Sequence, residues 1–217
     1  MDEIRQEIKE YLRTNWGIYS IIAALFALGV LAGALAVRGL DETQRQALNQ
    51  FFSAYLEHYR VTGTIDPGAA FRQSLRLNFQ YLFLIWIFGL LIYGYPFVAA
   101  LTVVRGFSVG FTVGFLVERA ALRGVLFAAG SVLPHNLLII PAFIVMAVTG
   151  FSLSWRRFRS RLTKRPISLR ERIGSYTITI FLVGLALFLG ILVEAYISPV
   201  FVKLLIPVIA ASAESFY

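Results

Sequence analysis

The chain has 217 residues, of which 58% are hydrophobic and only 15% charged, whereas ordinary soluble domains carry roughly 25% charged residues. A soluble domain of this length cannot bury so much apolar surface. The formal net charge is +8, but eight of the twenty Lys and Arg residues lie between Arg156 and Arg172. A basic loop of this kind is explained by membrane orientation and anionic lipid. We therefore exclude a soluble enzyme, a disordered tail and a nucleic-acid-binding module.

Long uncharged runs at 14–37, 77–104, 124–155 and 173–193, with a shorter one at 106–117, predict transmembrane helices. The first 15 residues are charged and helix-compatible. The run that follows them exceeds the 7–15 residues of a signal-peptide core, so we expect a retained first helix, although Ala34-Leu35-Ala36 offers a small-residue cleavage pattern.

Residues 38–76 form the largest polar segment and predict a helical insertion. Asp41 is placed to cap one helix, and Asp66-Pro67 is typical of the start of the next. Apolar residues recur between them at helical spacing, and this stripe needs lipid headgroups, the rest of the protein or a partner to cover it. The aromatic members of the stripe are the candidate partner-binding residues: Phe51, Phe52, Tyr55 and Tyr59.

Residues 77–118 are long enough for two short passes, with two alternatives for the turn between them. A turn at Gly94-Tyr95-Pro96 places Arg105 inside a helix. A turn at Arg105-Gly106 leaves a pass of only about 18 Å, too short to span without thinning of the bilayer. Either alternative gives two passes.

The run 124–155 is too long for one pass and contains Pro134 and Pro141, which predict a broken pass or a short outer helix leading into a pass at about 136–153. Ser168 and Glu171 have capping-box spacing and would start the last pass, at about 174–194. The tail 198–217 contains Lys203 and Pro207 and is expected to lie at the interface.

The short basic loop 156–172 should face the cytoplasm. With five passes, the N-terminus (1–15) then lies in the cytoplasm, while the 38–76 insertion and the 198–217 tail lie outside. The predicted fold class is therefore all-α. We expect residues 1–217 to form a single integral membrane domain, a polytopic helix bundle of about five transmembrane helices with a helical extracytoplasmic insertion.

Glycines four residues apart allow helix backbones to approach closely in lipid. Gly106, Gly110 and Gly114 have this spacing, and Gly29 and Gly33 repeat it in the first helix. These glycines are expected to form either a packing face inside the bundle or the face of a homo-oligomer or hetero-oligomer.

Two acidic residues, Glu118 and Glu194, fall near the outer ends of passes, where a charge is costly unless it is paired or hydrated. Arg119, Arg123 or Arg38 could neutralise them; a proton or substrate path is the alternative reading.

The sequence offers no catalytic, cofactor or metal site. Ser131 and His135 are four residues apart, but they lie on one stretch interrupted by Pro134 and lack an oriented base and an oxyanion site. His135 and Asn136 are expected instead to satisfy backbone groups freed by Pro134. The absence of cysteine excludes disulfides and thiolate sites.

Three segments together carry a resemblance to a known family: residues 107–117 (FSVGFTVGFLV), 132–136 (VLPHN) and 194–199 (EAYISP). With the predicted order of passes and the polar insertion, they resemble the stage II sporulation protein M family of endospore-forming bacteria. The wider family to which it belongs usually carries a glycine and a glutamate where this chain has Asn136 and Ile139, which favours the sporulation branch.

The resemblance implies a non-enzymatic membrane scaffold that acts in engulfment. It would hold two cell-wall hydrolases, the sporulation proteins D and P, at the septum and the engulfing mother-cell membrane. Membrane lipid is the other expected partner, and nucleic acid is not expected. The alternative is a transport component or permease subunit, suggested by the broken pass and the small-residue faces.

Overall fold

The computed structural model describes residues 2–62, 67–163 and 169–197, and the chain is helical in all three ranges, without a β-strand. The elements in chain order are α1 (Asp2–Ala36), the 3-10 turn η1 (Val37–Gly39), α2 (Glu42–Thr62), α3 (Pro67–Leu90), α4 (Tyr95–Ser131), α5 (Leu133–Thr163), α6 (Leu169–Leu192) and the π-helical segment η2 (Val193–Ile197). The predicted all-α fold is confirmed.

Within these described ranges, four segments are long and apolar enough to cross a membrane: Asn15–Gly39, Tyr95–Arg119, Leu133–Thr163 and Ile173–Ile197. The sequence predicts about five. Helix α3 is the remaining long helix of the bundle, but the polar residues of its first half, among them Arg76 and Asn78, lower its hydropathy.

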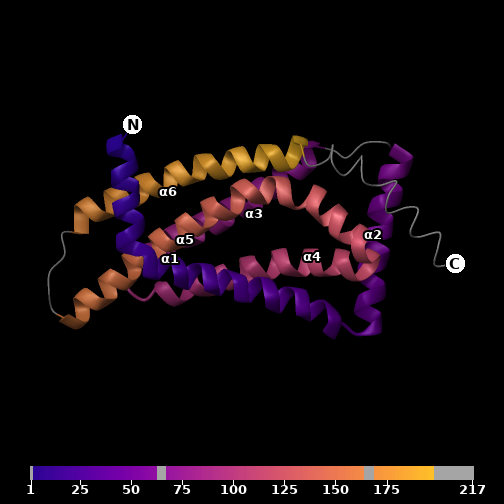
Figure 1. Ribbon diagram of the computed structural model, residues 1–217, viewed down its shortest axis with the longest axis horizontal. Helices are drawn as coiled ribbons and strands as arrows, with labels where there is room; N and C mark the ends of the chain where they lie inside the picture. The colour runs from indigo at the N-terminus through magenta and orange to yellow at the C-terminus, as the bar shows by residue number, and fades with distance from the viewer. Residues whose placement is uncertain (1, 63–66, 164–168, 198–217) are drawn as a thin grey trace.

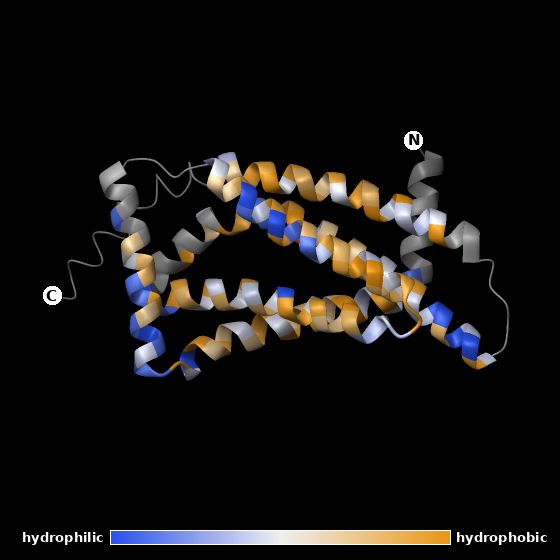
Figure 2. Ribbon diagram, turned by 180° about the vertical axis from the view of Figure 1, so that it is seen from behind, coloured by the Kyte–Doolittle hydropathy of each residue, from blue (hydrophilic) through white to orange (hydrophobic). Residues whose placement is uncertain are grey.

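Five helices, α1, α3, α4, α5 and α6, run along the length of the bundle, and α2 stands across one end of it (Figure 1). The first turns of α1, the last turns of α5 and the first turns of α6 lie at the opposite end. Hydrophobic residues cover most of the length of the bundle helices, and hydrophilic residues gather on α2, on the first turns of α3 and on the last turns of α5 (Figure 2). This distribution is that of a bundle with an apolar middle and two polar ends.

The core is built around α5, which packs against α1, α3, α4 and α6. Ile139, Phe143 and Met146 are almost completely buried there, together with Ile22 of α1 and Ile85 of α3. Because these side chains converge from helices far apart in the sequence, they fix the order in which the helices pack.

Two of the predicted helix starts are found in the structure. The side chain of Asp41 accepts a hydrogen bond from the Gln44 amide at 2.8 Å, and the Gln44 side chain accepts one from the Asp41 amide at 3.3 Å, which is a reciprocal N-terminal cap of α2. Pro67 is the first residue of α3, a position that tolerates its missing amide proton. Asp66, Ser168 and the 198–217 tail lie outside the described residues.

The turn between α3 and α4 is at 91–94, so the alternative that ends at Gly94-Tyr95-Pro96 is correct and Arg105 lies inside α4. A side chain at Gly94 would overlap the carbonyl of Phe88, which explains the glycine in this tight turn. The chain breaks again at Val132, two residues before Pro134. Pro141, by contrast, lies within α5 without ending it.

Candidate functional site

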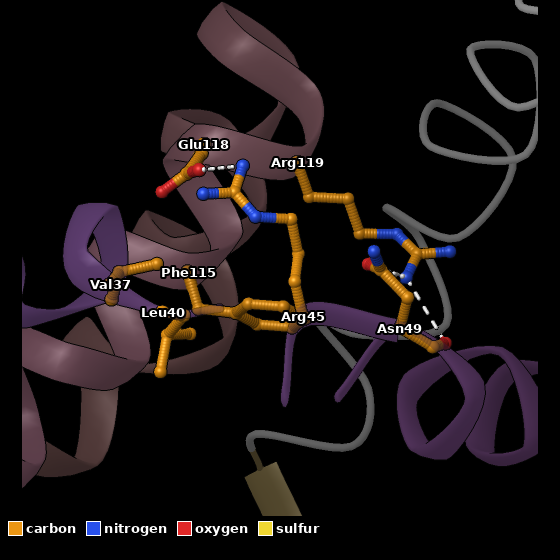
Figure 3. A pocket seen from close by; sticks show the side chains of 7 residues that line it. All are labelled: Val37, Leu40, Arg45, Asn49, Phe115, Glu118 and Arg119. Atoms are coloured by element: carbon orange, nitrogen blue, oxygen red, sulfur yellow. Dashed lines mark hydrogen bonds and ion pairs between the residues drawn. The ribbon is translucent and has the colours of Figure 1, made fainter. Parts of the chain in front are cut away.

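At one end of the bundle, α2 is attached to α4 by a group of charged and aromatic side chains, shown in Figure 3. Arg45 of α2 forms an ion pair with Glu118 of α4, with 2.5 Å between nitrogen and oxygen. Both side chains are about one-third exposed, so solvent screens this pair and it contributes little by itself, about 0–1 kcal/mol.

Arg119 makes the larger set of contacts. Its guanidinium donates to the Asn49 side-chain oxygen at 2.8 Å, to the Asn49 carbonyl at 3.2 Å and to the Ser53 hydroxyl at 3.0 Å. The same guanidinium lies 4.8 Å from the centre of the Phe52 ring. Phe52 in turn meets Phe115 edge to face, with 6.0 Å between ring centroids. We call this set, with the Arg45–Glu118 pair, the α2 anchor.

A small cleft of about 170 Å³ lies within the anchor, between η1, α2 and α4. Val37, Leu40 and Phe115 supply its apolar floor, and the charged groups of the anchor form its rim (Figure 3). Arg45 and Arg119 already have partners here, so the cleft fixes the position of α2 on α4 rather than presenting unpaired charge.

The candidate partner-binding aromatic residues do not share one environment. Phe52 packs into the anchor, as part of the protein's own structure. Phe51, the next residue, is 75% exposed. The side chains of Tyr55 and Tyr59 lie outside the part of the chain that the structure describes. Because successive helical residues point about 100° apart, the anchor that holds Phe52 also turns Phe51 away from the bundle.

A second set of polar contacts lies inside the bundle and connects α3, α4 and η2. Ser74 donates to the Glu194 carboxylate, and the Asn78 side-chain amide donates to the Ser74 carbonyl at 2.9 Å and to its hydroxyl at 3.1 Å. Arg105 donates to the Asn78 side-chain oxygen at 3.1 Å and lies over the Tyr81 ring at 5.4 Å. We call Ser74, Asn78, Arg105 and Glu194 the buried polar network.

The network joins an acid and a base through two neutral side chains. Ser74 and Asn78 are buried, and the charges of Arg105 and Glu194 attract each other across them. His135, at the start of α5, lies within electrostatic reach of both charges. The Arg105 Nε is buried without a hydrogen-bond partner among the described residues. Ionisable groups inside a membrane protein are costly, and such groups are expected to have a role.

The partners of the two acids, Glu118 and Glu194, differ from the arginines that the sequence suggested for them. Glu118 pairs with Arg45, and Arg119 binds α2 instead. Glu194 accepts a hydrogen bond from Ser74, which the sequence analysis did not single out. The polar residues in the first half of α3 were the available signal, but their partners lie too far away in the sequence to be inferred from spacing.

The residues around the break before α5 have local roles. Asn136 donates to the carbonyl of Val132 at 2.8 Å, and its amide nitrogen lies 3.1 Å from Nε2 of His135. The Asn136 side chain therefore bonds back to the carbonyl of the residue at which the helix breaks. Pro141 is exposed, and Ile139 is completely buried.

The five glycines face each other across α1 and α4. Side chains at Gly29 and Gly33 would overlap the backbone of α4 at Val103 and Phe107, and side chains at Gly106 and Gly110 would overlap the backbone of α1. A Cβ at Gly114 would lie 2.9 Å from the Ala34 Cα. An oligomer built on these glycines would first have to open the α1–α4 contact.

Among the described residues, no group of three or more His, Cys, Asp and Glu side chains is arranged to hold a metal ion. Ser131 has no described side chain, so its relation to His135 stays outside what the structure shows.

The sequence of this bundle matches one known protein family over most of its length. The family described as Stage II sporulation protein M matches residues 22–199. The chain belongs to the stage II sporulation protein M family. The matched range contains the α2 anchor, the buried polar network and the glycines, and membership indicates a sporulation-related membrane protein. No curated protein and no solved structure matches the chain.

Proposed function

We propose that this member of the stage II sporulation protein M family is a non-enzymatic membrane scaffold of the engulfment machinery. It would recruit cell-wall hydrolases, the sporulation proteins D and P, and hold them at the septal and engulfing membrane. Family membership supports the sporulation context. The α2 anchor supports the scaffold role within that context.

The observation that carries the proposal is the contrast between two neighbouring aromatic side chains. Phe52 is fixed by Arg119 and Phe115, while Phe51 is 75% exposed on the same helix. A partner that binds α2 would meet an aromatic residue on a helix that is already held in place. Helix α2 would therefore lose little conformational entropy when the partner binds. Aromatic residues, phenylalanine among them, are enriched in protein–protein interfaces relative to the rest of the protein surface.

The scaffold requires α2 to lie outside the cytoplasm, where wall hydrolases act. We propose that the N-terminus is cytoplasmic and that α3 is the fifth pass, beside the four candidate spans. The basic 156–172 loop would then face the cytoplasm. The first turns of α1, the last turns of α5 and the first turns of α6 lie at the end of the bundle opposite α2 (Figure 1), as this topology requires.

The test replaces Phe51 with Ser in sporulating cells and measures membrane level, co-purification of the two hydrolases and engulfment. Phe97→Ser is the matched control, because Phe97 is 54% exposed but lies at the start of α4, away from α2. We expect Phe51→Ser to keep a normal membrane level and to lose hydrolase co-purification by about tenfold, the effect of removing one modest hot spot. Intact co-purification with Phe51→Ser would exclude Phe51 as the recognition residue.

A further inference from the structure

The outward face of α3 carries three exposed polar side chains at the spacing of one helical face. We call these residues, Gln73, Arg76 and Gln80, the α3 stripe. Residues two apart on a helix point about 200° away from each other. The stripe therefore points away from the buried polar network, to which α3 contributes Ser74 and Asn78. Arg76 and Gln80 make no hydrogen bond or ion pair with the described part of the chain.

The depth of the stripe follows from the contact between α3 and η2. Ser74 donates to Glu194, near the end of the Ile173–Ile197 candidate span. Because a helix rises about 1.5 Å per residue, Gln80 lies about 9 Å further along α3, inside the hydrocarbon region in the proposed topology. The long Arg76 side chain can reach back to the headgroups, but the Gln80 amide is too deep to do so. Lipid offers this amide no hydrogen-bond partner.

Other exposed polar side chains of the bundle are satisfied by their own helix. Ser108 and Thr112 of α4 donate to carbonyls four residues earlier, at 3.0 and 2.9 Å, and Thr179 of α6 does the same at 2.9 Å. The α3 stripe makes no such bonds through Arg76 or Gln80. Helix α3 is also the long bundle helix outside the four candidate spans. Polar residues of this kind are tolerated in a membrane where a neighbouring helix covers them.

We propose that the α3 stripe is the docking face for a transmembrane helix of another protein. That helix carries Asp or Glu opposite Arg76 and a hydrogen-bonding side chain opposite Gln80. Further along, the same face of α3 continues with exposed Phe83, an apolar surface on which a helix can pack. Close packing and interhelical hydrogen bonds drive the association of helices in lipid. This inference rests on the proposed passage of α3 through the membrane and is independent of hydrolase recognition by α2.

The charge of the stripe disfavours a second copy of this chain as the partner. A symmetric dimer through α3 would place Arg76 of the two copies at the same depth on facing helices, where like charges repel in a medium of low dielectric constant. The four candidate spans offer no free acid either. The acids within their ranges are Glu118 and Glu194, and these already bind Arg45 and Ser74 of the same chain. The complementary acid therefore belongs to a different protein.

The test places a photo-crosslinking amino acid at position 77 of the full-length protein in sporulating cells. Leu77 is exposed between Arg76 and Gln80, so both polar side chains stay intact. Position 182 of α6 is the control, because Leu182 is exposed on an apolar helix. We expect position 77 to crosslink to a transmembrane helix of another protein, with Asp or Glu within one turn of the crosslinked residue. Position 182 should give lipid adducts.

Three variants, each measured together with its membrane level, make the result specific to the stripe. Arg76→Leu should lower the crosslink yield from position 77 by about fivefold or more, the equivalent of losing about 1 kcal/mol of association. Arg76→Lys keeps the charge and should keep the yield. Exchanging the charges, with Arg76→Glu in this chain and Arg in place of the partner's acid, should restore the crosslink.

The remaining outcomes would overturn the proposal in distinguishable ways. Lipid adducts alone from position 77, or a protein crosslink that Arg76→Leu leaves unchanged, would show that the stripe holds no partner helix. A crosslink to a second copy would assign the face to a dimer. A crosslink to a water-soluble protein would show that this part of α3 lies outside the membrane and would overturn the proposed fifth pass as well.

Discussion

At the residue scale, α1 and α4 can lie so close together only because the residues at their contact are glycines, which have no Cβ. Gly110 faces the carbonyl of Val30, and a Cβ there would overlap it. Gly110→Ala should therefore lower the stability of the bundle by about 1–3 kcal/mol, the usual cost of overpacking. The shift in the unfolding midpoint in detergent measures this.

The matched control for this prediction is Gly17→Ala, since Gly17 lies in α1, the helix that Gly110 of α4 contacts, and a Cβ at Gly17 meets nothing within 4 Å. Its midpoint should stay unchanged or rise slightly, because alanine favours the helix over glycine by about 1 kcal/mol. If Gly110→Ala and Gly17→Ala unfold alike, the glycines do not determine how closely α1 and α4 approach.

The buried polar network makes a prediction about two residues that do not touch directly. Arg105→Met should destabilise the protein by about 3 kcal/mol, because it leaves the Glu194 carboxylate without a compensating charge. Glu194→Gln should be tolerated better in the Arg105→Met background than in the wild type. Unfolding of both single variants and the double variant in detergent gives the coupling energy, which we expect to be about 1 kcal/mol or more.

If the effects of the two single substitutions on the free energy of unfolding add up to that of the double variant within about 0.5 kcal/mol, Ser74 and Asn78 separate the two charges rather than connect them. Ser74→Ala is a useful companion variant. It removes the hydroxyl that donates to Glu194 and should reduce the measured coupling.

At the element scale, α2 is held mainly by Arg119. This residue combines three hydrogen bonds with a contact over the Phe52 ring, whereas Arg45 makes one partly exposed ion pair. Arg119→Ala should therefore release α2 and speed its cleavage by an added protease by about tenfold. Arg45→Ala should change the cleavage rate by less than about fivefold, as expected for an exposed pair of 0–1 kcal/mol. Equal effects of the two variants would contradict this view of the anchor.

The elements that depend on neighbouring residues could be predicted from the sequence. Asp41 and Gln44 are three residues apart, so their reciprocal cap is a local pattern. Pro67 and the break before Pro134 follow from the missing amide proton of proline. The sequence left two alternatives for the position of the α3–α4 turn. The choice depends on whether Arg105 can lie inside a helix, and in the folded bundle it can, because it donates a hydrogen bond to Asn78 of α3.

The buried polar network could not be predicted in the same way. Ser74 and Glu194 are 120 residues apart, and only the packing of α3 against α6 and η2 brings them together. The pairing of Glu118 with Arg45 likewise depends on how α2 crosses the end of the bundle. Local spacing predicted Phe51 and Phe52 as one aromatic stripe, but contact with Phe115 separates their roles.

At the scale of the whole molecule, the proposed topology places the two polar ends of the bundle on opposite sides of the membrane. The chain has no cysteine, so single cysteines report on each side. Ala54→Cys on α2 and Leu162→Cys at the end of α5 are both at exposed positions. An impermeant thiol reagent should label position 54 in intact cells and label position 162 only after the membrane is opened. Labelling of position 162 in intact cells would reverse the proposed orientation.

The central claim is that the exposed face of α2 meets the wall hydrolases directly. A photo-crosslinking amino acid at position 51, activated in sporulating cells, tests this most directly, with position 97 as the control at the far end of the bundle. We expect a crosslink from position 51 to sporulation protein D or P and none from position 97. Efficient crosslinking from position 97, with none from position 51, would contradict the claim.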